Sequence, residues 1–152
     1  MSQRLDPAQA APEAIRAMRT LQAHVNASGI DKRLGELVKI RASQLNGCAY
    51  CLALHVDLAR RQGEAQARID MLPAWREAGE LYAERERAAL ALAEAVTRIG
   101  DAGVPEPVYA QAARHFEPGE LVELTLMIAT INAWNRLMAT FRVPPAITPA
   151  AG

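Results

Sequence analysis

The chain has 152 residues, of which 51% are hydrophobic and 22% are charged, and its 17 Lys and Arg residues balance its 17 Asp and Glu residues. This length and composition are typical of one globular domain. Because the charges balance and no basic cluster is present, we do not expect nucleic acid or an anionic membrane as a partner.

Prolines divide the chain into long stretches rich in Ala, Leu, Glu and Arg, which are typical of helices. Alternating runs of β-branched and aromatic residues are missing, so we expect an all-α protein with few or no strands. Residues 1–10 and 143–152 are expected to form a flexible N-terminal tail and a C-terminal tail around a single domain at 11–142. The predicted helices cover residues 12–27, 31–45, 48–62, 64–72, 84–99, 106–115 and 118–141, with a short segment at 75–82.

The last predicted helix is apolar almost all round over residues 121–141. Such a helix is buried on several sides, in a core or against another subunit, and we therefore expect a homo-oligomer. Trp134 is assigned to this core or interface. Glu123, Asn132 and Arg136 argue against a span across lipid. The first residues lack an apolar secretion segment, so we expect a cytoplasmic, reducing environment.

The two cysteines of the chain are Cys48 and Cys51, and His55 follows four residues after the second. On a helix these side chains fall at about 0°, 300° and 340° and share one stripe, whereas Tyr50, at about 200°, is expected to point the other way. Helical residues three apart lie about 5 to 6 Å from each other, which suits a disulfide. A bridge over so short a loop stabilises a fold by only about 2 kcal/mol, so we expect a redox-active pair.

Two features compete to activate these thiols. The helix N-terminus favours a thiolate at Cys48, while His55, one turn after Cys51, can accept the proton of that thiol directly or through water. Glu36 lies on the preceding helix, and antiparallel packing could bring it over the cysteine stripe. From spacing alone, the attacking cysteine and the role of Glu36 stay open.

The set Glu36, Cys48-x-x-Cys51 and His55, with Ser43-Gln-Leu-Asn-Gly before the first cysteine, resembles the active-site motif of the AhpD-like alkyl hydroperoxidases in the carboxymuconolactone decarboxylase superfamily. The resemblance implies an AhpD-like bundle of about six to eight helices, usually a trimer or hexamer. It implies that Cys51 attacks a hydroperoxide and becomes a sulfenic acid. Cys48 would donate a proton and then resolve this acid to a Cys48–Cys51 disulfide, while Glu36 and His55 relay protons. The implied partners are a hydroperoxide substrate and a thiol reductant or lipoyl-type adaptor protein, with no cofactor and no metal.

The chain departs from AhpD at Tyr50, where AhpD has a histidine. Tyrosine is not a base near neutral pH, so its effect on peroxidase activity and on the choice of reductant stays open. Decarboxylases of the superfamily work without the cysteine pair, so we do not expect decarboxylation. Two alternatives remain: a Cys-x-x-Cys disulfide oxidoreductase, and a non-enzymatic zinc-binding protein with ligands from Cys48, Cys51, His55 and Glu36.

Overall fold

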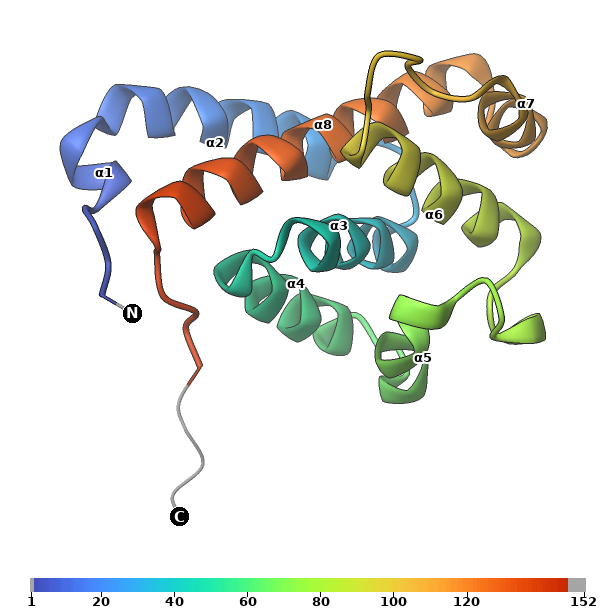
Figure 1. Ribbon diagram of the computed structural model, residues 1–152, viewed down its shortest axis with the longest axis horizontal. Coiled ribbons are helices and arrows are strands. Elements are labelled where there is room, and N and C mark those ends of the chain that lie inside the picture. Colours follow the sequence, from blue (N-terminus) through green and yellow to red (C-terminus); the bar gives the residue numbers. More distant parts are fainter. Residues whose placement is uncertain (1, 148–152) are drawn as a thin grey trace.

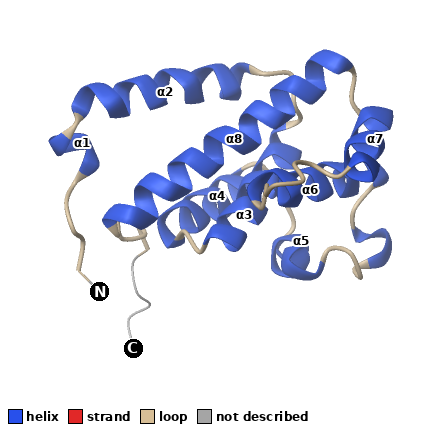
Figure 2. Ribbon diagram, turned by 45° about the horizontal axis from the view of Figure 1, so that its top comes forward, coloured by secondary structure: helices blue, strands red, loops and turns tan. Residues whose placement is uncertain are grey.

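Figure 1 shows the computed structural model of the chain, which describes residues 2–147. These residues form eight α-helices and two short 3₁₀ turns, and apart from one isolated bridge between Gly100 and Gly103 they contain no β-structure (Figure 2). The prediction of an all-α protein is confirmed. The helices are α1 (Pro7–Ala10), α2 (Pro12–Ala27), α3 (Lys32–Asn46), α4 (Ala49–Arg61), α5 (Gln66–Met71), α6 (Glu84–Thr97), α7 (Glu106–His115) and α8 (Pro118–Phe141).

Local capping signals fix the two helices that flank the cysteine motif. The Asp31 side chain accepts a hydrogen bond from the backbone N–H of Leu34 at 3.0 Å and so begins α3. Gly47, with a φ of 63°, ends α3 in the left-handed conformation that glycine adopts at low cost. Cys48 is the N-cap of α4, and its Sγ accepts a hydrogen bond from the backbone N–H of Cys51 at 3.3 Å. The predicted break at Asn46-Gly47 therefore places the cysteine pair at the start of a helix.

Helix α3 occupies the centre of the fold, between α8 on one side and α4 on the other (Figure 1). It also packs against α6, and residues 34–40 are all buried. Because neighbours surround the helix, two charged side chains, Glu36 and Lys39, are buried together with its apolar ones. Charged groups in such a position require partners, and these partners form part of the site described below.

Helix α8 packs against α2, α3, α4, α6 and α7 within the same chain. These contacts account for most of its apolar surface, although Val122 remains 67% exposed. Homo-oligomerisation therefore stays a prediction. Within residues 2–147, no helix combines the length and apolar character needed to cross a membrane.

The N-terminal segment lies beside the end of α8. The backbone N–H of Arg4 donates to the carbonyl of Phe141 at 2.9 Å, and Arg4 Nη1 donates to the carbonyl of Thr140 at 2.9 Å. Asp6 then caps helix α1, which lies inside the segment expected as a tail. Of the expected C-terminal tail at 143–152, residues 148–152 lie outside the described residues.

Candidate active site

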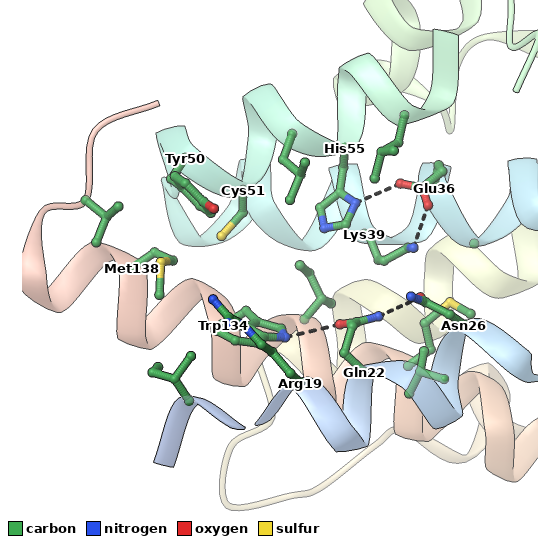
Figure 3. Close-up of a pocket in the computed structure, with 18 of the residues that line it drawn as sticks. Arg19, Gln22, Asn26, Glu36, Lys39, Tyr50, Cys51, His55, Trp134 and Met138 are labelled. Carbon is green, nitrogen blue, oxygen red and sulfur yellow. Dashed lines mark hydrogen bonds and ion pairs between the residues drawn. The ribbon is translucent and has the colours of Figure 1, made fainter. Parts of the chain in front are cut away.

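A cavity of about 560 Å³ is lined by residues from α1, α2, α3, α4 and α8 (Figure 3). Cys51, His55, Glu36 and Lys39 all line it. Three of the four predicted site residues, Cys51, His55 and Glu36, thus meet at one largely apolar cavity. Its apolar wall is formed by Ile15, Val25, Ile30, Leu54, Leu58, Met127, Ile131, Trp134, Met138 and Val143.

Cys48 and Cys51 are paired as a disulfide, with their Cα atoms 5.4 Å apart. Each residue is only 2% exposed. Cys51 lines the cavity, whereas Cys48 does not and packs in a cluster with Ala42, Ile131 and Met138. A small molecule in the cavity therefore meets Cys51 and not Cys48.

Glu36 and His55 form a buried pair between α3 and α4, with His55 Nδ1 2.7 Å from Glu36 Oε2. A carboxylate only accepts hydrogen bonds, so Nδ1 carries the proton and Nε2 is left on the opposite side of the ring. Figure 3 shows the His55 ring between Cys51 and Glu36. No hydrogen bond joins His55 to either sulfur within residues 2–147, so a proton passing between His55 and Cys51 would cross a water or a substrate.

Lys39 is a third member of this cluster that the sequence analysis missed. Its Nζ donates to Glu36 Oε1 at 2.5 Å, and the residue is 6% exposed. Burial raises the pKa of Glu36, but the hydrogen bonds and charges of His55 and Lys39 outweigh it and hold this pKa below its ordinary value. Glu36 is therefore ionised at neutral pH. The available signal was the spacing of Glu36 and Lys39, which puts them on one face of a helix.

A buried polar network connects this cluster to α8. Ser43 Oγ donates to the carbonyl of Lys39 at 2.7 Å and accepts from Asn135 Nδ2 at 3.1 Å. Asn46 Nδ2 donates to the side-chain oxygens of Asn132 and Asn135, both at 2.9 Å. The network fixes the end of α3 against α8 and so positions the turn from which the cysteine helix begins.

Two aromatic side chains line the cavity, and one of them lies differently from what the sequence predicts. Tyr50 lines the same cavity as Cys51, so the expectation that it points away is wrong. Neighbouring helical positions diverge by only about 100°, and a wide cavity admits both side chains. Trp134 is half-buried on the cavity wall, where its Nε1 donates to Gln22 Oε1 at 3.1 Å and connects α8 to α2.

The geometry does not favour a zinc site. Within residues 2–147, no group of three or more His, Cys, Asp and Glu side chains is arranged to hold a metal ion. The two sulfurs are bonded to each other, and His55 Nδ1 is bound to Glu36. In this oxidised form the donor atoms that zinc would need are therefore already paired.

Known proteins share both the sequence and the fold. Residues 11–95 match the model of the Carboxymuconolactone decarboxylase family. Over 137 residues the chain is 40% identical to the uncharacterised protein YdfG of Bacillus subtilis, covering 90% of this chain and 92% of YdfG.

Two solved structures resemble the present one. One is a protein of unknown function from Agrobacterium tumefaciens, described as a candidate antioxidant defence protein AhpD, with a TM-score of 0.93 and 37% identity over 97% of this chain and all of the other. The second is the debrominase Bmp8, with a TM-score of 0.78 and 24% identity over 91% of this chain and 73% of Bmp8. The likeness to Bmp8 shows the fold alone. The family match covers more than half of the sequence, and this AhpD-like chain belongs to the carboxymuconolactone decarboxylase family.

Proposed function

We propose that the protein is a thiol peroxidase that reduces hydrogen peroxide or organic hydroperoxides through Cys51 and Cys48. The observation that carries this proposal is the placement of the pair: Cys51 lines the cavity, and Cys48 lies behind it at disulfide distance. His55 and the ionised carboxylate of Glu36 lie in the same cavity wall.

In the first step the Cys51 thiolate attacks the terminal oxygen of the hydroperoxide. The O–O bond breaks, Cys51 becomes a sulfenic acid, and the leaving oxygen takes up a proton and departs as water or an alcohol. Glu36 holds His55 by its Nδ1–H, which leaves Nε2 to take the thiol proton through a water and return it to the leaving oxygen.

In the second step the Cys48 sulfur attacks the sulfur of the sulfenic acid. A Cys48–Cys51 disulfide forms and one water leaves. The position of Cys48 at the start of α4 supports this step, because the helix N-terminus stabilises a thiolate there. A thiol reductant or a lipoyl-type adaptor protein then supplies two electrons and two protons to regenerate the dithiol. The cytoplasm, where thiols are kept reduced, suits this cycle. We also propose that the protein assembles as a homotrimer or homohexamer.

Disulfide exchange with another protein is the competing function of the same pair. Both cysteines are only 2% exposed, and Cys51 is reached through the cavity. A disulfide fixed in a folded protein has poorer access to a sulfur at this depth than a small hydroperoxide or a group carried on a flexible arm. Burial of the pair therefore favours a small oxidant over a protein one.

The test uses pre-reduced protein and one equivalent of cumene hydroperoxide or hydrogen peroxide, with free thiols and intact mass followed over time. We expect the loss of both thiols and of two hydrogen atoms within seconds, and no such change in Cys51→Ser. Thiols that survive peroxide for many minutes, but are oxidised at once by a small disulfide, would replace the peroxidase by a disulfide oxidoreductase.

A further inference from the structure

Lys39 offers hydrogen-bond donors that the protein does not use. Its ammonium group has three N–H bonds, and Glu36 Oε1 accepts one of them at 2.5 Å. No other acceptor for Nζ is found within residues 2–147, although the residue is only 6% exposed. Lys39 lines the cavity, and Figure 3 shows its amine on the cavity side of α3. A buried ammonium with unpaired donors binds an acceptor, preferably an anionic one.

The other charged groups of the cavity add to this preference. Arg19 and Lys32 also line the cavity, and Arg19 makes no hydrogen bond or ion pair to any described residue. The two carboxylates of the lining are already engaged: Asp6 accepts from two backbone N–H groups of α1, and Glu36 is held by His55 and Lys39. The charges left for a ligand are therefore positive.

The rest of the chamber is suited to a hydrocarbon body. Ile15, Val25, Met127 and Ile131 present apolar surface, and the Trp134 ring forms part of the wall. A volume of about 560 Å³ far exceeds the space that hydrogen peroxide needs and lies in the range of pockets that enclose small organic ligands.

We propose that this cavity selects an organic hydroperoxide whose apolar body carries a carboxylate, with the carboxylate bound by Lys39 and the hydroperoxide group at Cys51. This inference rests on the proposed peroxidase function and names its substrate class. The reaction at Cys51 is unchanged: the O–O bond breaks, the sulfur is oxidised, and the substrate leaves as a hydroxy acid.

Binding is tested with two unreactive probes, cumyl alcohol and its para-carboxylate, titrated into the oxidised protein by calorimetry. We expect the wild type to bind the carboxylate about tenfold more tightly than the neutral alcohol, and Lys39→Met to lose this preference. Arg16→Gln removes a positive charge from α2 outside the cavity and should keep the preference. Equal affinities of the wild type for the two probes, a comparison that needs no variant, would overturn the inference. Full preference in a folded Lys39→Met protein would do the same.

A kinetic comparison separates this inference from the proposed function. Reduced wild-type protein is mixed with cumene hydroperoxide or with its para-carboxylate, and thiol loss is timed. Faster oxidation by the carboxylate supports the inference. Equal rates would overturn the inference and leave the proposed peroxidase function intact. Thiols left untouched by both peroxides would overturn the peroxidase function. In that case the binding preference measured by calorimetry would still decide for or against the carboxylate site.

Discussion

Replacing Glu36 with glutamine tests whether the buried Lys39–Glu36–His55 cluster is held together by charge. Glu36 is 3% exposed and accepts from His55 Nδ1 at 2.7 Å and from Lys39 Nζ at 2.5 Å. A glutamine offers one acceptor oxygen in place of two, so one buried donor loses its partner. Removing one partner of a buried charge pair costs about 3 to 5 kcal/mol in the free energy of unfolding. In a chain of this length that loss lowers Tm by about 6 to 20 °C.

Glu123→Gln is a matched control, because Glu123 also pairs with a histidine. The distance from His24 Nε2 to Glu123 Oε1 is 3.1 Å, but the two side chains are 59% and 32% exposed. An exposed pair contributes at most about 1 kcal/mol, so this variant should unfold close to the wild type in urea. A Glu36→Gln protein within about 1 kcal/mol of wild type at neutral pH would show that charge does not hold the cluster together.

The charge of Glu36 also predicts how the stability difference between wild type and Glu36→Gln changes with pH. Burial raises the pKa of Glu36. His55 and Lys39 lower this pKa by more than burial raises it, so it lies below its ordinary value of 4.5. Its contribution to stability is therefore complete above about pH 4.5 and is lost as the pH falls through the lowered pKa. The glutamine variant lacks this titration. The stability gap between wild type and variant should stay constant near neutral pH and narrow in acid, and a gap that widens in acid would contradict the charge argument.

Three further predictions concern stability measured by urea unfolding. Asn135→Ala removes the side chain that joins Ser43 to Asn46 in the buried network, and should cost about 1 to 3 kcal/mol. Asp31→Ala removes the cap on the Leu34 N–H and should cost about 0.5 to 2 kcal/mol. Reducing the Cys48–Cys51 disulfide should cost no more than about 2 kcal/mol because its loop is so short, and a much larger loss would mark the bridge as structural.

The helices could be predicted from the sequence because their ends carry local signals. Asp31 and Gly47 bound α3, and Pro118 begins α8, as expected from capping and proline preferences. The spacing of Cys48, Cys51 and His55 is also a local signal, because 3.6 residues per turn place the three side chains on one stripe of a helix. Glu36 could be assigned to the site only through the family resemblance, because spacing along the chain does not fix which faces of two helices meet.

The parts of the site that were missed depend on tertiary packing. A lysine is ordinarily exposed, and Lys39 is buried only because α3 has neighbours on several sides. Tyr50 turns toward the cavity because that space is open, which a helical wheel cannot show. The sequence predicts Trp134 in a core or interface, and it packs against a core cluster, but its place on the cavity wall depends on how α2 lies along α8. Sequence periodicity places side chains on a helix, whereas cavities arise between helices.

In the proposed cycle Cys51 attacks the peroxide and Cys48 resolves the product. Trapping the sulfenic acid separates these two roles: reduced Cys48→Ser and Cys51→Ser are each treated with one equivalent of cumene hydroperoxide in the presence of dimedone, and the adduct is located by peptide mass spectrometry. We expect a sulfenic acid adduct on Cys51 in Cys48→Ser and none in Cys51→Ser. An adduct on Cys48 in Cys51→Ser, with Cys51 unmodified in Cys48→Ser, would contradict the proposed cycle.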